Sequence, residues 1–143
     1  MDTHFFGTLA VTRAFAPQLA ASGGGAVLNI LSVLSWLSIP RSGAYCAAKS
    51  AEWSLTNALR LELAPQGTQV TALHVGYMDT DMTRRLDVPK SDPAAIAKLA
   101  IDGIAAGDAE IIADETSTRV LAGLSAGVAG LYPQVADYAR PAR

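Results

Sequence analysis

The chain has 143 residues, of which 50% are hydrophobic and 17% are charged, and its formal net charge at pH 7 is −2. This composition excludes a disordered chain and predicts one packed domain. The sequence has no run of basic residues and no apolar run of membrane-spanning length, which argues against nucleic acid or a membrane as a partner.

Hydrophobic periodicity predicts helices that alternate with buried strands along the chain. The first helix should end at the glycine turn 23–25, and the second should be stopped by Pro65 and Gly67. Loops are predicted at 32–44 and at 76–90, the latter with a short helix. The predicted helices cover 2–21, 45–64, 93–106 and 114–123, and the predicted strands cover 26–31, 69–75 and 109–113.

This alternation of helices and strands predicts an α/β fold with a parallel sheet flanked by helices. It matches the second half of a doubly wound, Rossmann-type sheet. No glycine-rich phosphate-binding fingerprint follows an early strand, and the glycines at 23–25 precede a strand, as in a simple turn.

A tyrosine and a lysine, Tyr45 and Lys49, lie four residues apart at the start of the second predicted helix. Residues at this spacing project from one face of a helix, so the phenol and the ammonium should be neighbours. An ammonium favours the phenolate and lowers its pKa, which suits a tyrosine that exchanges a proton with an alcohol or carbonyl oxygen. Ser32, thirteen residues upstream at a strand end, could hold the same oxygen.

These residues occur among sequence blocks that resemble the short-chain dehydrogenase/reductase family. The resemblance is specific over residues 1–81 and looser to about Gly123. It rests on the glycine turn, Ser32, the Tyr45–Lys49 pair, the run from Leu59 to Gly67, and the run from His74 to Met82.

The resemblance implies a role for each residue of the motif. Tyr45 is implied as the catalytic acid-base, and Lys49 as the residue that lowers its pKa and binds the nicotinamide ribose. Ser32 is implied as the substrate-oxygen binder, with Ser35 as the competing candidate. The implied cofactor, NAD or NADP, would contact Tyr45, Lys49, Gly76, Tyr77, Met78 and Thr80.

Two positions depart from the family pattern. Val75 stands where the family usually has a proline, which would fix φ at that position. His4 begins the sequence His-Phe-Phe-Gly where the family has Asn-x-x-Gly, and the asparagine helps to hold a water that links to the lysine. Histidine can also form hydrogen bonds, but it is bulkier and titrates near neutral pH.

Since the family's diphosphate contacts are not found, the sequence predicts the C-terminal catalytic half of the fold, with the N-terminal cofactor-binding half absent. Residues 1–143 would then form one partial domain, a fragment or truncated product, with an irregular tail at 124–143.

The leading functional interpretation is hydride transfer between NAD(P) and a small carbonyl or alcohol substrate. The alternative is an inactive fragment that acts as a structural or interaction module. A serine hydrolase based on Ser32 is the weakest reading, since no G-x-S-x-G elbow is present. No metal site is predicted, because Asp79 and Asp81 are too few to form one.

The resemblance also implies a homo-oligomer formed through helices 2–21 and 45–64, whose small and apolar residues allow close packing. The single cysteine, Cys46, rules out an internal disulfide and is typical of a reducing compartment such as the cytoplasm.

Overall fold

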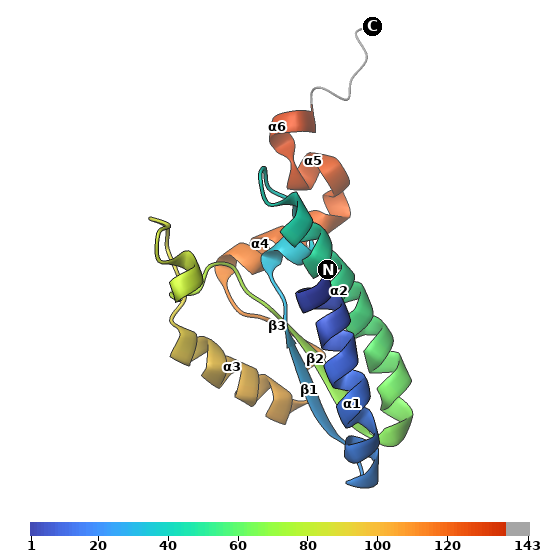
Figure 1. Cartoon of the computed structure of the whole chain (residues 1–143). Helices are drawn as coiled ribbons and strands as arrows, with labels where there is room; N and C mark the ends of the chain where they lie inside the picture. Colours follow the sequence, from blue (N-terminus) through green and yellow to red (C-terminus); the bar gives the residue numbers. More distant parts are fainter. Residues whose placement is uncertain (137–143) are drawn as a thin grey trace, which may run out of the picture.

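Three parallel strands form the centre of the protein in a computed structural model that describes residues 1–136 (Figure 1). The central strand β2 (Thr68–His74) lies between β1 (Gly25–Ile30) and β3 (Glu110–Ile112). Gly25 pairs with Thr68 at one end of the sheet, and His74 pairs with Ile112 at the other. All but one residue of β2 are buried, as expected for a parallel strand covered on both faces.

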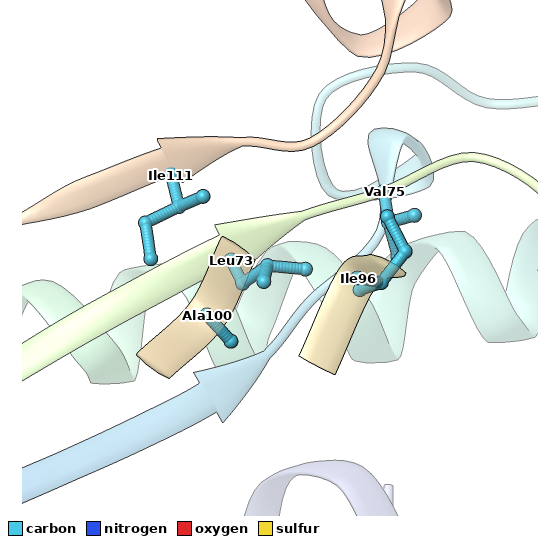
Figure 2. Close-up of a cluster of buried hydrophobic side chains, with 5 residues drawn as sticks. All are labelled: Leu73, Val75, Ile96, Ala100 and Ile111. Atoms are coloured by element: carbon cyan, nitrogen blue, oxygen red, sulfur yellow. The ribbon is translucent and has the colours of Figure 1, made fainter. Parts of the chain in front are cut away.

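Helices cover both faces of this sheet (Figure 1). On one face lie α1 (Thr8–Ala21) and α2 (Gly43–Leu63), and on the other lies α3 (Pro93–Ala106). The core under α3 consists of Leu73, Val75, Ile96, Ala100 and Ile111 (Figure 2). A second cluster under α1 and α2 is formed by Leu59, Leu63 and Val70.

Side-chain caps define where two of the helices begin. Asp92 accepts hydrogen bonds from the backbone nitrogens of Ala94 and Ala95, and Pro93 occupies the first helical position of α3. Asp114 caps α4 (Glu115–Gly123) by accepting from the Ser117 nitrogen at 2.7 Å.

The glycine turn is confirmed and has a steric reason. Gly23 and Gly24 both have positive φ, at 84° and 116°. A β-carbon on Gly24 would lie 2.2 Å from the carbonyl oxygen of Gly67, the residue that precedes β2. The chain can therefore enter β1 beside the start of β2 only with glycine at position 24.

Several predicted boundaries need correction. The first predicted helix is divided into a π-helical segment η1 (Asp2–Gly7) and α1, and α2 begins at Gly43 rather than at residue 45. The segment predicted as an irregular tail begins with short helices, and its residues 137–143 lie outside the described part. These short helices are η5 (Leu124–Ala126), α5 (Gly127–Leu131) and α6 (Pro133–Ala136).

Three further 3-10 segments lie in the connections: η2 (Val33–Ser35), η3 (Ala64–Gln66) and η4 (Asp81–Thr83). Across residues 1–136, none of the helices combines the length and the apolar character that a membrane crossing requires. The sequence predicted one half of a larger doubly wound sheet. The described residues instead form a three-stranded parallel sheet with an apolar cluster on each face.

Candidate active site

The carboxyl ends of β1 and β2 meet at one edge of the sheet, where polar side chains gather. The Val33 nitrogen donates to the Val75 oxygen at 3.0 Å, which holds the two strand ends together. Ser32 follows β1 directly, is buried, and caps η2 by accepting from the Leu34 nitrogen at 3.1 Å. Its neighbour Ser35 is also buried, but the Ser35 hydroxyl accepts from the Ser32 nitrogen and thus supports the turn.

Tyr45 lies in the first turn of α2 and is half-buried. Burial raises the pKa of the Tyr45 phenol, the Ser32 side chain lowers it through a hydrogen bond, and the negative charge of Glu52 raises it further. The net direction of the Tyr45 pKa is upward, and the lowering of this pKa by Lys49 stays a prediction. Ser32 and Tyr45 lie near enough to each other for the Ser32 side chain to affect the pKa of the Tyr45 phenol.

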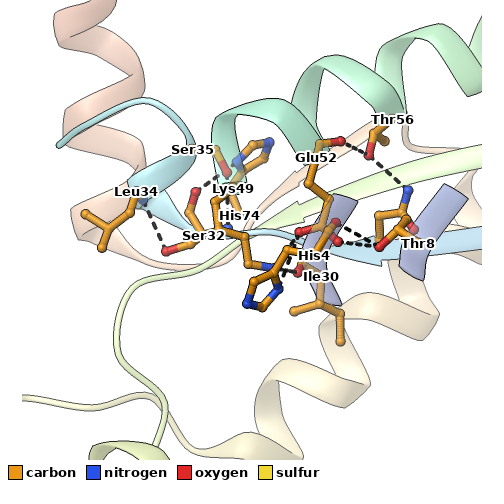
Figure 3. A network of polar contacts seen from close by, with 11 residues as sticks. His4, Thr8, Ile30, Ser32, Leu34, Ser35, Lys49, Glu52, Thr56 and His74 are labelled. Atoms are coloured by element: carbon orange, nitrogen blue, oxygen red, sulfur yellow. Dashed lines mark hydrogen bonds and ion pairs between the residues drawn. The ribbon is translucent and has the colours of Figure 1, made fainter. Parts of the chain in front are cut away.

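Lys49 lies one turn after Tyr45 and is buried, with its ammonium engaged by two oxygen atoms (Figure 3). Its Nζ donates to the Ile30 carbonyl oxygen at 2.9 Å and to Glu52 Oε2 at 2.6 Å. The Glu52 carboxylate therefore lies directly beside the ammonium that the sequence paired with Tyr45.

The loop after β2 is held by backbone hydrogen bonds and by one carboxylate. The Gly76 nitrogen donates to Asp114 Oδ2 at 2.5 Å, and the Ser91 nitrogen donates to the Tyr77 oxygen at 2.8 Å. The Thr83 hydroxyl donates to the Met78 carbonyl oxygen. Within residues 1–136, no hydrogen bond joins the exposed Thr80 to Ser32, Tyr45 or Lys49, and the backbone of Thr80 contacts the Thr83 hydroxyl in its own loop.

Two residues at this site, Glu52 and Thr8, were not recognised from the sequence. Glu52 is buried, and its Oε1 accepts a hydrogen bond from the Thr8 hydroxyl at 2.8 Å (Figure 3). The spacing of Glu52, three residues after Lys49, was a readable signal for an ion pair on one helix face. Its contact with Thr8, from a distant part of the sequence, was not readable.

His4 lies beside the same group. Its ring makes an edge contact with Tyr45 at a centroid distance of 5.4 Å, and its Nδ1 is 4.0 Å from Glu52 Oε2. Burial and the charge of Lys49 lower the pKa of His4, while Glu52 raises it. Over the described residues, no set of three or more metal-ligating side chains converges here or elsewhere.

Comparison with known proteins gives consistent matches. Residues 1–90 match the profile of the family described as short chain dehydrogenase. The SadH protein of Mycobacterium tuberculosis, named as an oxidoreductase, is 29% identical over 93% of this chain and 59% of its own length. A dehydrogenase/reductase SDR family member 7B of Xenopus laevis is 37% identical over 58% of this chain and 26% of its own.

Solved structures match the fold closely. A short chain dehydrogenase of Burkholderia cenocepacia in complex with NADP superposes with a TM-score of 0.88 and 31% identity, over 95% of this chain and 59% of that chain. A short-chain dehydrogenase of Sphingobium yanoikuyae in complex with NADPH has a TM-score of 0.72 and 23% identity, over 98% of this chain and 57% of that one, so it supports the fold alone. The chain thus spans 59% of the length of SadH and 59% of the length of the Burkholderia cenocepacia dehydrogenase.

These matches correct the predicted fold class. The profile match occupies the first 90 residues of this chain, and the NADP-bound structure superposes over nearly all of it, as a Rossmann nucleotide-binding portion. The prediction of a C-terminal half without its cofactor-binding half is therefore wrong. It treated the missing glycine fingerprint as a missing half, whereas the three parallel strands, packed on both faces, are themselves of the Rossmann type.

Proposed function

The chain belongs to the short-chain dehydrogenase family, and from this premise we propose that its site serves hydride transfer between a nicotinamide dinucleotide and a small carbonyl or alcohol. The observation that carries the proposal is the grouping of Ser32, Tyr45 and Lys49 at the carboxyl edge of the sheet. In open α/β sheets, ligands bind at this edge.

Each of the three residues has a distinct role in this proposal. Tyr45 gives its phenol proton to the substrate oxygen during reduction and takes it back during oxidation. Ser32, which interacts with the Tyr45 phenol, holds the same oxygen. Lys49 supplies a buried positive charge and a donor next to the cofactor ribose.

The residues present fit a nicotinamide nucleoside. The Lys49 ammonium has three N–H donors, of which two are used by Ile30 and Glu52, so one remains for a ribose hydroxyl. Tyr45 is accessible on the same helix face, and Gly76, Tyr77, Met78 and Thr80 supply the loop that would border the nicotinamide. When bound, the nicotinamide supplies the hydride. NADP is the form to test before NAD, because the Burkholderia cenocepacia relative with 31% identity was solved in complex with NADP.

The test is steady-state oxidation of NADPH by the chain with a panel of ketones and aldehydes, for the original protein and for Tyr45→Phe. Loss of the general acid should lower kcat by roughly 10²–10⁴-fold. Tyr132→Phe is the matched control: it removes a tyrosine hydroxyl that accepts a hydrogen bond from the Ser38 nitrogen, and activity should stay within a few-fold. A Tyr45→Phe variant as active as this control contradicts the role of Tyr45.

A second candidate function is a structural or interaction module that lacks turnover. It is favoured by large apolar side chains that are exposed on η1, α1 and α2, namely Phe6, Val11, Phe15 and Leu61. We propose that these helices pack against a second copy of the chain, as a symmetric dimer would require. A monomeric mass at micromolar concentration in analytical ultracentrifugation contradicts this association.

A further inference from the structure

Glu52 places a carboxylate inside the proposed active site. Only 7% of its side-chain surface is exposed, and 8% of that of Lys49. Both carboxylate oxygens have partners, with Thr8 Oγ1 on Oε1 at 2.8 Å and Lys49 Nζ on Oε2 at 2.6 Å (Figure 3). Glu52 therefore joins the N-terminal segment to the lysine of the site.

A purely structural ion pair would not need to be buried here. The chain has comparable pairs on the surface of its helices, such as Lys98–Asp102 and Arg119–Glu115, where the charges stay in water. Burying two charges is costly, and an apolar pair of similar volume is often at least as stable. The buried Lys49–Glu52 pair therefore calls for a role beyond stabilising α2.

The titratable groups around Tyr45 come from two elements. His4 of η1 contacts the ring of Tyr45 by its edge, and Cys46, Lys49 and Glu52 lie on α2. The His4 side chain is 32% exposed, so it lies on the solvent side of Glu52, with its Nδ1 4.0 Å from Oε2. Among these groups, Glu52 alone lies within 4.0 Å of both Lys49 and His4.

We propose that Glu52 is a positioning residue of this site, whose carboxylate fixes the Lys49 ammonium against β1 and, together with His4, sets the charge that Tyr45 experiences. The Ile30 carbonyl is the β1 group that Lys49 reaches. The proposal rests on the proposed function for its role in catalysis, but its electrostatic part holds for the folded chain without turnover.

The first experiment compares Glu52→Gln with Glu62→Gln, which makes the same chemical change at an exposed position of the same helix. Tyrosinate absorbance during an alkaline titration, with the Tyr45→Phe trace subtracted, isolates Tyr45 from the other three tyrosines. Without the Glu52 carboxylate, the Lys49 charge is no longer offset, so Tyr45 should ionise at lower pH. Glu62→Gln should titrate like the original protein.

The second readout is the titration of His4 by NMR, assigned by comparison with His4→Gln, since the chain has only two histidines. Glu52 stabilises the imidazolium, so His4 should titrate at lower pH in Glu52→Gln and remain unchanged in Glu62→Gln. If Tyr45 and His4 titrate at the same pH in Glu52→Gln as in Glu62→Gln, the proposal is overturned.

If Glu52→Gln does not fold, Glu52→Asp tests the positioning directly. It keeps the charge but is one methylene shorter, so it cannot hold Lys49 and Thr8 together. NADPH binding, followed by cofactor fluorescence, should be weaker in Glu52→Asp than in Glu62→Asp, and equal binding overturns the proposal. If the original chain binds no NADPH at all, the proposed function fails, while the Tyr45 and His4 titrations, repeated with Glu52→Asp against Glu62→Asp, still decide the role of Glu52.

Discussion

At the scale of single residues, Asp114 has two structural roles. It caps α4, and it also holds the start of the loop that is proposed to border the nicotinamide. One of its oxygens accepts from the Ser117 nitrogen and the other from the Gly76 nitrogen. A β-carbon on Gly76 would lie 3.1 Å from that second oxygen, so glycine allows the close approach. Asp114 therefore links α4 to the turn that begins the loop.

This link predicts the result of Asp114→Ala. Loss of a helix cap alone costs about 1 kcal/mol, and an unpartnered, half-buried N–H at Gly76 adds roughly 1 kcal/mol or more. Asp92→Ala, which removes only the exposed cap of α3, is the matched control. Chemical denaturation should show a larger loss of stability for Asp114→Ala, and limited proteolysis should cut the 76–90 loop faster. Equal losses in the two variants would show that the Gly76 contact contributes nothing.

The same scale shows where reading the sequence was sufficient and where it was not. The spacing of Tyr45 and Lys49 put both on one helix face, and the strand end before Ser32 brought it to the same edge. The charge balance was missed, because it depends on Glu52 and on Thr8, whose hydrogen bond spans 44 positions of the sequence. Contacts between distant segments leave no periodic signal.

At the scale of elements, the helices and strands were predictable because their signals are local. The caps at Asp92 and Asp114, the apolar runs of β1 and β2, and the stop at Gly67 are all short-range features. The π-helical start at 2–7 and the helices after residue 123 were not predicted. Their sequences contain no distinct cap, so the conformation depends on packing against other elements.

The contact between two turns gives a prediction at this scale. Gly24→Ala should destabilise the fold by roughly 2–4 kcal/mol, because the new methyl group meets the Gly67 backbone and the positive φ adds strain. Gly23→Ala carries a similar strain from φ but meets no atom within 4 Å, so it should cost only about 1–2 kcal/mol. Urea unfolding of both variants measures the difference, and a Gly24→Ala loss no larger than that of Gly23→Ala would remove the steric explanation.

At the scale of the whole molecule, the buried histidine predicts how stability depends on pH. His74 is fully buried, and its ring stacks on Trp36 at a centroid distance of 3.8 Å. Burial lowers the pKa of His74, while hydrogen bonding to the Ser32 backbone and the charge of Glu110 raise it in part. The folded state therefore holds His74 neutral at a pH where the unfolded chain, with a pKa of about 6.5, binds a proton.

The sign follows from proton linkage: the free energy of unfolding should be constant above about pH 6.5 and fall as the pH decreases below it. His74→Gln, neutral at every pH, should be less stable than the original protein but should lose much of this slope. The pH dependence that remains in His74→Gln comes in part from His4, whose pKa is also lowered in the folded state. Denaturant titrations between about pH 7.5 and pH 5.5 measure the free energy of unfolding of both proteins. If its dependence on pH is the same in His74→Gln as in the original protein, the buried histidine is not the cause of that dependence.

Because Gly25 pairs with Thr68, with the whole of α2 between them, the sheet cannot form until a long loop has closed. Helical turns of α2 can form within about a microsecond, whereas parallel pairing of this kind slows two-state folding. On this basis we expect α2, with Tyr45 and Lys49, to become ordered before the strand end that carries Ser32. Stopped-flow kinetics of two variants test this order. Ala58→Gly on α2 should slow folding, whereas Ile111→Val on β3 should mainly speed unfolding.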